Sequence, residues 1–313
     1  MADKRPSNLD IRTAYGKSLI DRSAELEAAG QRADAISAAA EATDVLAKVG
    51  AADQSDATGM AFLARAKANL GKLYLRDAQA AKAEVPIDEA IALYQAAQKR
   101  VATPDLLRDL AGVYADQATT KKLLNKPAPA ATAMTGALFS LDRYAIQTPT
   151  LPDGPAESAR LSAQLAQEAA AQPTIALRHW RKAVASGREA YKRFLAQKSL
   201  TGRTDYATYY GQYATALIDT LVGEGDAAGA AKTASELTDL PAKWSGWTDV
   251  AALLGRAANR AENDAKSACV RESLACLKRA SASGTLDSVK LRESSDFAAL
   301  RETAEFQSLV RPP

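Results

Sequence analysis

Clusters of proline, glycine and aspartate interrupt this chain at regular intervals, and this spacing constrains the fold more than any other feature. The clusters lie near Gly30, Gly50–Ser55, Val85–Pro86, Thr103–Pro104, Lys126–Pro129, Thr148–Pro155, Gln172–Pro173, Gly202–Thr204, Gly223–Asp226, Leu240–Pro241 and Ser283–Thr285. Between them, segments of about 15 to 27 residues place apolar side chains three and four residues apart, as amphipathic helices do. Consecutive segments pair into hairpins with a period of roughly 40 residues, which predicts a helical repeat array.

The composition agrees with a fold made of helices alone. Alanine, the best helix former, accounts for about 71 of the 313 residues, whereas aromatic residues make up 6%. Valine, isoleucine and threonine are too sparse for a chain rich in strands. We therefore expect an all-α, right-handed α-solenoid. Its six hairpins should cover residues 9–49, 54–102, 104–147, 155–199, 203–239 and 243–283.

Several helix boundaries follow from single residues. Pro86 and Pro104 can each occupy the first turn of a helix, where the missing N–H would have had no partner. Gly30 and Gly223 suit the left-handed residue that ends a helix before a tight turn. The segment 148–155 carries three prolines, so we expect it to be a non-helical joint. The predicted organisation is a tail (1–8), three hairpins (9–147), the joint (148–155), three hairpins (156–283), and a C-terminal cap and tail (284–313).

The composition also excludes several chemistries. His179 is the one histidine, so paired-histidine metal sites and histidine relays are ruled out, and two cysteines cannot form a disulfide framework. No stretch is apolar enough for a membrane span, and the start Met1–Pro6 is no signal peptide, which favours a cytoplasmic location. A net charge of +3 is too small to imply a nucleic-acid partner. We expect no enzyme activity, no cofactor and no metal.

The second hairpin resembles the tetratricopeptide repeat (TPR). The resemblance is carried by Leu70-Gly71-x-x-Tyr74, by Ala90-x-x-x-Tyr94 and by Pro104. Lys67 departs from it, since the pattern usually has a large aromatic there, and the gap between Gly71 and Ala90 is longer than standard. The physical reason for the pattern is that small residues at a helix crossing let two helices approach closely. The resemblance implies TPR-like hairpins.

Residues 243–310 resemble a more particular group, the C-terminal ends of TPR arrays attached to serine/threonine protein kinases of planctomycete-type bacteria. The segment 291–301, Leu-Arg-Glu-Ser-Ser-Asp-Phe-Ala-Ala-Leu-Arg, followed by Glu305-Phe306-Gln-Ser-Leu309, matches their capping pattern. The kinase domain itself is absent: there is no glycine-rich loop and no Asp-Phe-Gly, and His179 is followed by Trp180. The resemblance implies a regulatory or sensory lobe of a signalling kinase system.

The first candidate site is a polar stripe on the first helix of the second hairpin. Four residues spaced four, three and four apart share one face, and a fifth on the next first helix extends it: Arg65, Asn69, Lys72, Arg76 and Arg108. The TPR resemblance implies that this helix lines the concave groove. Guanidinium and ammonium donors on a rigid helix suit a carboxylate, so we expect an acidic peptide or a C-terminal carboxylate there. The alternative is a solvated helix face with Lys67 and Asp77 as partners.

The second candidate is the basic helix 173–199. Eight Lys or Arg and one acid lie between Arg178 and Arg203, and Arg181, Arg188 and Lys192 share one face. Such a face attracts phosphate or RNA. The competing interpretation is neutralisation by the neighbouring hairpin, because residues 204–264 hold nine acids against four bases.

Three further features favour structural roles. We interpret His179 as a structural histidine because no nucleophile motif accompanies it, and Cys269 and Cys276 as small core residues. Tyr206, Tyr210 and Tyr213 follow helical spacing and should pack inward, which leaves Tyr209 exposed. A peptide-contacting tyrosine patch remains the alternative.

A non-catalytic scaffold that binds a peptide or a partner domain is the leading functional hypothesis, because such an array offers a large rigid surface. The kinase-system lobe is the second hypothesis and a phosphate- or RNA-binding array through helix 173–199 the third. An open array must also cover its last apolar face. We therefore expect residues 286–310 to form a cap in which Phe297, Leu300 and Phe306 dock against helix 267–283, near Leu274 and Leu277.

Overall fold

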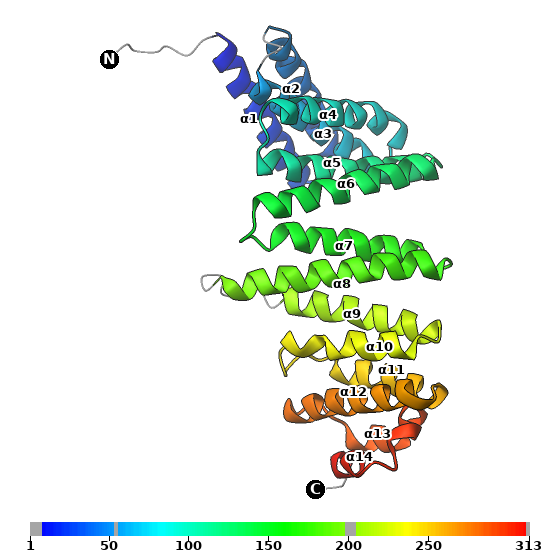
Figure 1. Cartoon of the computed structure of the whole chain (residues 1–313). Coiled ribbons are helices and arrows are strands. Elements are labelled where there is room, and N and C mark those ends of the chain that lie inside the picture. Colours follow the sequence, from blue (N-terminus) through cyan, green and yellow to red (C-terminus); the bar gives the residue numbers. More distant parts are fainter. Residues whose placement is uncertain (1–7, 53–55, 198–204, 311–313) are drawn as a thin grey trace. The chain divides into compact units, whose positions relative to one another are not determined.

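The computed structural model describes residues 8–52, 56–197 and 205–310, and within these ranges the regular secondary structure is helical (Figure 1). Twelve longer helices follow one another: α1 (Asn8–Ala28), α2 (Arg32–Ala52), α3 (Ala57–Arg76), α4 (Ala80–Arg100), α5 (Pro104–Leu123), α6 (Pro127–Gln147), α7 (Asp153–Glu168), α8 (Pro173–Ala196), α9 (Asp205–Gly223), α10 (Ala227–Ser235), α11 (Trp247–Arg260) and α12 (Asn263–Ala282). The predicted all-α array of helical hairpins is confirmed.

Successive helices pack in pairs, as hairpins do. α1 packs on α2, α3 on α4, α5 on α6, α7 on α8, α9 on α10 and α11 on α12. The chain divides into two compact units, Met1–Thr148 and Pro149–Pro313, and this division lies at the start of the proline-rich segment. Each unit contains three of the hairpins.

Proline placement agrees with the expectation at one position and differs at another. Pro104 is the first residue of α5, and the Thr103 hydroxyl before it accepts from the Leu106 N–H over 3.4 Å. Pro86 lies inside α4, so its predicted place in a first turn is wrong. α4 begins six residues earlier, at Ala80, because the turn before it already closes α3 at Asp77. A proline in a helix interior costs about 3 kcal/mol, and burial of the Pro86 ring offsets part of this.

The turns inside four hairpins use one residue in the left-handed region. These residues are Gly30 (φ 77°), Ala78 (φ 57°), Asn125 (φ 55°) and Gly225 (φ 80°). The N–H of each of these residues donates to the carbonyl three residues earlier, and the N–H of the following residue donates to the carbonyl five residues before it. These two hydrogen bonds satisfy carbonyl groups at the end of the first helix. The expectation for Gly30 is confirmed. The one for Gly223 is wrong, because α9 continues through Gly223 and the turn residue is Gly225.

The joint is shorter than predicted. α7 starts at Asp153, so Gly154 and Pro155 belong to its first turn. A proline is tolerated there, since the first backbone N–H groups of a helix have no partner inside it. The non-helical stretch is therefore limited to a few residues after α6.

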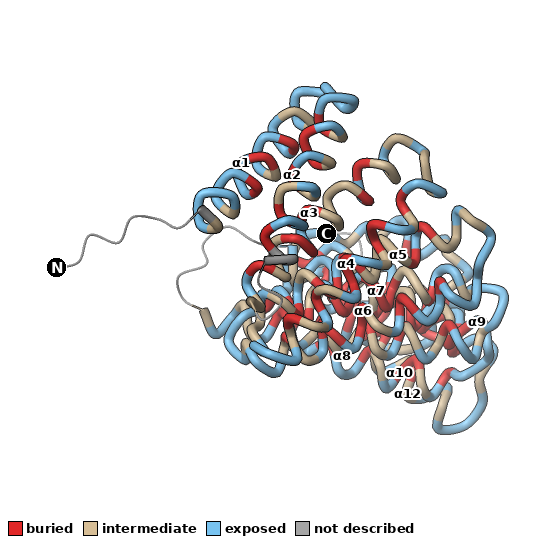
Figure 2. The backbone as a smooth tube through the Cα atoms, turned by 90° about the horizontal axis from the view of Figure 1, so that it is seen from above, coloured by how far each residue is buried: buried red, intermediate tan, exposed pale blue. Residues whose placement is uncertain are grey.

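Close helix approach in unit 1 depends on small residues, as the TPR-like pattern implies. At Gly71 in α3, an added Cβ would lie 2.4 Å from Cγ1 of Ile87 in α4. Both residues are buried, and Ala83 and Ala90 next to Ile87 on α4 are fully buried as well. Along the helices, buried positions recur among exposed ones, as in helices with one face in a core (Figure 2). The high alanine content is thus used to bring helices close together.

The first helices of successive hairpins also contact one another. In unit 1, α3 lies against both α1 and α5, and in unit 2, α9 lies against α11. We call these contacting first helices the first-helix layer of each unit. Side chains on the solvent side of this layer belong to different hairpins yet lie next to each other, and both candidate grooves described below form there.

The C-terminal segment forms a cap on the last hairpin. It comprises α13 (Ser288–Glu293), the 3₁₀ helix η2 (Ser295–Leu300) and α14 (Ala304–Leu309). Phe297, Leu300 and Phe306 are at most 3% exposed, and the two phenylalanine rings lie 5.9 Å apart. The predicted docking surface is correct in part: α14 packs on α12, whereas η2 packs chiefly on α11.

Two residues of α11 explain why η2 packs on this helix and not chiefly on α12. A Cβ at Gly255 would lie 2.4 Å from the Asp296 carbonyl oxygen, so the glycine admits the cap backbone. The Asn259 side chain donates to the Ser295 and Asp296 carbonyls, over 3.0 and 3.2 Å, and accepts from the Ala299 N–H over 2.8 Å. The backbone of η2 is therefore held by α11, and the cap covers the side of the last hairpin that this helix presents.

Among the described helices, none is both long and apolar enough to cross a lipid bilayer.

Candidate functional site

Four of the five predicted groove residues line one shallow pocket in unit 1. The pocket has a volume of about 260 Å³ and lies between α3 and α5. α3 contributes Arg65, Asn69 and Lys72 to it, and α5 contributes Arg108. Arg76, the fifth, lies one turn further along α3, where it faces α1. We call this pocket the α3/α5 groove.

Arg65 is held by an acid from the next hairpin. Its Nη2 donates to Oδ2 of Asp109 on α5 over 2.7 Å, and this hydrogen bond raises the pKa of the Arg65 guanidinium. The Tyr94 hydroxyl of α4 lies 3.4 Å from the same carboxylate oxygen. Burial, followed by the Asp109 charge, raises the pKa of Tyr94, so this tyrosine remains a neutral donor. Arg65 therefore fixes α3 against α5 and shares its charge with Asp109.

Two other predicted residues bond to α1. The Asn69 side chain donates to the Ser23 hydroxyl over 2.9 Å, and Arg76 pairs with Glu27. Lys67 and Asp77, the partners expected if the stripe is a solvated helix face, pair instead with Glu89 of α4 and with Arg32 of α2. The stripe on α3 thus links three hairpins of the first-helix layer.

The remaining two cations of the stripe are the most available for a ligand. Lys72 is exposed and makes no ion pair with any residue that the structure describes. Arg108 is paired at 3.1 Å with Asp105 one turn away on its own helix, and both side chains are more than half exposed. Such an exposed pair contributes little to stability and exchanges readily for another anion.

Asp116 on α5 forms the acidic end of the same groove. Burial raises the pKa of its carboxyl, while the nearby charges of Lys72 and Arg76 oppose this shift. The groove therefore contains three cations, Arg65, Lys72 and Arg108, against two acids, Asp109 and Asp116. This arrangement favours an anionic ligand.

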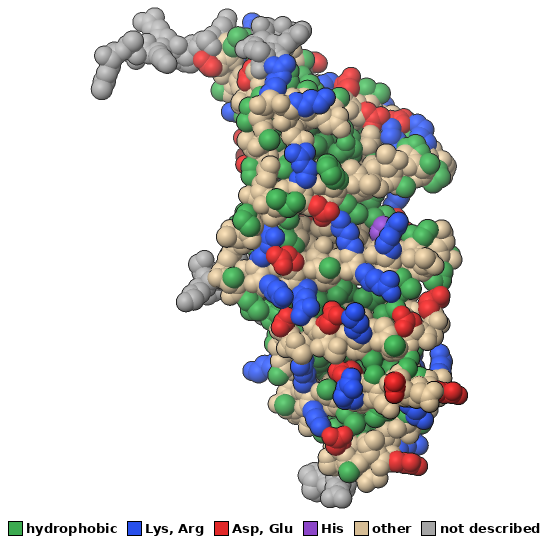
Figure 3. All heavy atoms as spheres, in the orientation of Figure 1, with side chains coloured by type: hydrophobic (Ala, Val, Ile, Leu, Met, Phe, Trp, Pro, Cys, Tyr) green, Lys and Arg blue, Asp and Glu red, His purple; other side chains and the backbone are tan. Residues whose placement is uncertain are grey.

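The predicted basic patch on α8 is partly neutralised by its own unit. Arg188 pairs with Asp239 over 3.1 Å and with Glu236 over 3.8 Å, both from the neighbouring hairpin. Arg181 and Lys192 are exposed. In the surface view, basic side chains in the region of α8 alternate with acidic ones (Figure 3). The charge of Arg188 is thus used within the fold, as the neutralisation alternative expects.

The three structural expectations can be checked in unit 2. Cys269 and Cys276 are buried, and burial raises the pKa of Cys276 to about 12. Burial, followed by the charges of Arg178 and Lys182, also lowers the pKa of His179, which favours the neutral imidazole. Tyr210 is fully buried, whereas Tyr209 is 52% exposed and stacks on Tyr213 with the ring centroids 6.5 Å apart. The inward and outward tyrosines lie as predicted.

No group of three or more His, Cys, Asp or Glu side chains suited to a metal ion occurs among the residues that the structure describes.

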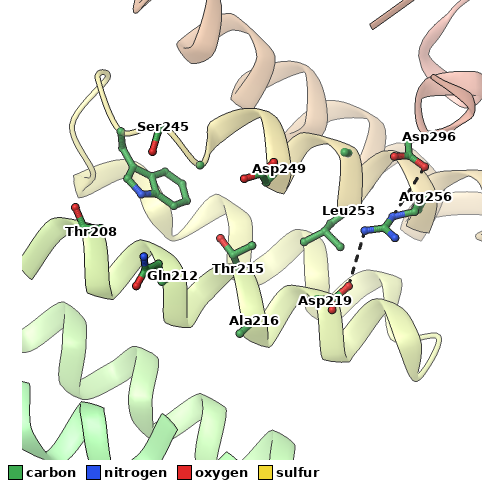
Figure 4. A pocket seen from close by; sticks show the side chains of 13 residues that line it. Thr208, Gln212, Thr215, Ala216, Asp219, Ser245, Asp249, Leu253, Arg256 and Asp296 are labelled. Carbon is green, nitrogen blue, oxygen red and sulfur yellow. Dashed lines mark ion pairs between the residues drawn. The ribbon is translucent and has the colours of Figure 1, made fainter. Parts of the chain in front are cut away.

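A second groove, which the sequence did not suggest, lies in unit 2. It has a volume of about 680 Å³ and is formed between α9 and α11 (Figure 4). Thr208, Gln212 and Thr215 line its α9 side, with Asp219 at the end of the row. These residues are spaced four, three and four apart, as Arg65, Asn69, Lys72 and Arg76 are on α3. This spacing is the one signal in the sequence that could have indicated a groove here. The row on α9 lacks the basic side chains that made the row on α3 a candidate site. We call this pocket the α9/α11 groove.

Comparisons with known proteins assign no family. No family model matches this sequence, and no curated protein matches it. Solved structures of low similarity include the nuclear import adaptor Nro1 of S. pombe, 15% identical over 97% of this chain and 99% of that one, with a TM-score of 0.43. A tetratricopeptide repeat protein from Parabacteroides merdae is 13% identical over 92% and 100% of the two chains, with a TM-score of 0.30. The assembly chaperone Acl4 is 16% identical over 94% of both chains, with a TM-score of 0.33. These similarities are too weak to assign a function.

Proposed function

We propose that this protein is a non-catalytic scaffold that binds a peptide or a partner domain on its first-helix layer. The observation that carries the proposal is the α3/α5 groove. Side chains from two hairpins meet there on rigid helices, and two of its cations, Lys72 and Arg108, are exposed with little internal pairing. Nothing in the groove has the arrangement of a nucleophile with its general base, so binding is the chemistry it supports.

The ligand that fits the α3/α5 groove is an acidic segment or a chain end with a free carboxylate. Lys72 and Arg108 supply charged donors, and Arg65 adds a third that is already oriented by Asp109. Charge-assisted hydrogen bonds from donors held in advance are stronger than neutral ones and lose less entropy on binding. Asn69 and Arg76 support the groove by fixing α3 against α1.

A direct binding experiment tests this proposal. Peptides ending in a short acidic run, each with a free and with an amidated C-terminus, are titrated into the intact chain. We expect Lys72→Glu combined with Arg108→Glu to weaken binding of the free-carboxylate peptides about ten- to hundredfold, the effect of losing one or two charged hydrogen bonds. The matched control is Lys48→Glu, which reverses an exposed charge on α2 outside the groove. Equal affinity of the double variant and the wild type would contradict the groove assignment.

The two other functional hypotheses make different predictions. The kinase-system lobe rests on the resemblance of residues 243–310, and the structure uses the matching residues Phe297, Leu300 and Phe306 in the cap. A role there predicts association with a separate signalling kinase. A phosphate- or RNA-binding role of α8 predicts steep salt dependence and loss of binding when Arg181 and Lys192 are replaced. The pairing of Arg188 with Asp239 favours the scaffold instead.

A further inference from the structure

The α9/α11 groove is lined by an excess of acidic side chains. Asp219 comes from α9, Asp249 from α11 and Asp296 from the C-terminal cap, and Arg256 is the basic residue among the lining side chains. Arg256 lies 3.8 Å from Asp219 and 4.0 Å from Asp296, as the dashed lines in Figure 4 show. The four charged side chains therefore carry a net charge of about −2 at neutral pH.

The ion pairs of Arg256 leave much of the negative charge of the groove available to a ligand. Both ion pairs of Arg256 are long, and the side chains of Arg256 and Asp219 are 45% and 67% exposed. Asp249 lies in the first turn of α11, is exposed, and forms no ion pair with any described residue. A cation that enters the groove can thus contact Asp249 directly and can compete with Arg256 for Asp219 and Asp296.

The groove also offers neutral and aromatic surface suited to a peptide. Thr208, Gln212 and Thr215 present hydroxyl and amide groups along the α9 side, and Ala216 and Leu253 form an apolar part of the lining, with Leu253 between Asp249 and Arg256 (Figure 4). Trp244 also lines the groove. An aromatic ring attracts the charged or aliphatic part of an arginine or lysine side chain.

The dimensions limit what the groove accepts. The row from Thr208 to Asp219 spans eleven residues of helix, or about 17 Å, which matches about five residues of extended chain. Asp249 and Arg256 are seven residues apart on α11, so the two acidic ends of the groove are separated by about 10 Å. Three residues of extended peptide cover that distance. Two basic side chains three residues apart would each reach one end.

We infer that the α9/α11 groove binds an extended basic peptide segment in which two lysines or arginines lie three residues apart. This inference rests on the proposed scaffold function and extends it, since it gives the two units ligands of opposite charge. A divalent metal is a poorer occupant because the described residues contain no cluster able to hold one. Nucleic acid is disfavoured by repulsion from the three carboxylates.

The test uses the intact chain and labelled synthetic peptides. The probe is an alanine–serine peptide with two lysines three residues apart, compared with its glutamate counterpart and with an isomer that has adjacent lysines. Fluorescence anisotropy should show binding of the first peptide, several-fold weaker binding of the isomer, and none of the glutamate peptide. Binding should weaken as salt is added.

Variants then connect the binding to named residues. Asp249→Asn and Asp219→Asn should each weaken binding about tenfold, the loss expected for one charge-assisted contact. Arg256→Ala should strengthen it several-fold, because it removes the internal competitor of the peptide. Such a gain cannot result from misfolding. Glu224→Gln, at an exposed acid in the turn after α9, is the matched control and should leave the affinity unchanged.

The outcomes separate this inference from the scaffold proposal. Equal binding of the lysine and glutamate peptides, or unchanged affinity of Asp249→Asn and Arg256→Ala, would overturn the inference. If acidic peptides still bind the α3/α5 groove and respond to Lys72 and Arg108, the scaffold proposal survives that result. If neither groove binds any of these peptides, the scaffold proposal fails as well.

Discussion

Arg65 and Asp109 are 44 residues apart in the sequence, yet the guanidinium of one donates to the carboxylate of the other over 2.7 Å. This pair joins the second and third hairpins at the floor of the α3/α5 groove. It also reduces the positive charge that a ligand meets there. The same contact therefore stabilises the first-helix layer and weakens the attraction for an anion, and these two effects can be separated by substitution.

Replacing Asp109 by asparagine should improve anion binding. Asp109→Asn keeps an oxygen that can accept from Arg65 but removes the negative charge, so the groove gains one net positive charge. We expect the affinity for a free-carboxylate acidic peptide to rise about three- to tenfold, measured by titration at low salt. The control Asp44→Asn removes an exposed acid of α2 and should have no effect. A weaker affinity in Asp109→Asn would mean that the orientation of Arg65 matters more than the charge.

Gly71 should be irreplaceable for steric reasons. In Gly71→Ala the new methyl group would lie 2.4 Å from Cγ1 of the buried Ile87, so α3 and α4 must separate or Ile87 must change rotamer. Overpacking of this kind costs about 1–3 kcal/mol, which lowers the melting temperature by several degrees. Gly112→Ala on α5 is the matched control. It meets no atom within 4 Å and should stabilise by roughly 0.5–1 kcal/mol. Thermal unfolding of both variants should therefore shift in opposite directions.

Ala78 is a site where glycine should increase stability. Its φ of 57° lies in the left-handed region, which costs an L-residue roughly 1–2 kcal/mol. Ala78→Gly removes this strain at a smaller entropic cost in the unfolded chain, so we expect a net gain of about 0.5–1 kcal/mol in urea unfolding. Ala81→Gly, three residues later in the first turn of α4, makes the same chemical change at a helical position and should destabilise. A loss of stability in Ala78→Gly would contradict this explanation of the turn.

Asp116 should make stability depend on pH. Its pKa is raised in the folded state by burial, so the folded protein holds this proton at a pH where the unfolded chain has lost it. Stability then decreases as the pH rises from the ordinary aspartate pKa through the raised one. Asp116→Asn cannot ionise, so it should be more stable than the wild type at pH 7 and nearly equal to it at pH 4. Urea unfolding at both values measures this, and a variant that is less stable at pH 7 would show that attraction from Lys72 and Arg76 dominates.

The cap should be essential for the last hairpin. A chain ending at Ser283 exposes the surface now covered by Phe297, Leu300 and Phe306, each worth roughly 1.5–3 kcal/mol of burial. It should aggregate or melt at a clearly lower temperature. In the full chain, Asn259→Ala removes three hydrogen bonds to the cap backbone and should cost about 1–3 kcal/mol, whereas its exposed neighbour Arg260→Ala should cost far less. A monomeric truncated chain with an unchanged melting temperature would show that the cap is dispensable.

The sequence predicted the hairpins well because their signals are local. Helix ends depend on nearby residues such as Thr103 and Pro104 or Gly30, and the observed bounds agree with the expected ones to within a few residues. The errors at Gly223 and Pro86 have the same origin. Gly223 and Gly225 both lie near the end of α9 and either could close it, and nothing in the local pattern shows that α4 begins before its proline.

The sites were less predictable because they depend on distant partners. Spacing placed Arg65, Asn69 and Lys72 on one face, but it could not show that Asp109 or Ser23 would bond to two of them. The α9/α11 groove takes its three acids from three separate segments, and one of them belongs to the cap. Each of these acids looks like an ordinary surface residue in its own segment, so the groove emerges only when the helices are packed together.

The position of Asp296 couples the end of the chain to ligand binding. This residue belongs to η2, whose backbone is bound to Asn259, and its carboxylate faces Arg256 at the mouth of the α9/α11 groove. By thermodynamic linkage, a basic peptide that binds more tightly when Asp296 is in place must favour the docked cap by the same factor. Amide hydrogens of residues 295–309 should then exchange more slowly in the presence of the peptide, and a protease that cuts the undocked cap should act more slowly. The C-terminal segment would thus report occupancy of a groove that is otherwise formed by α9 and α11.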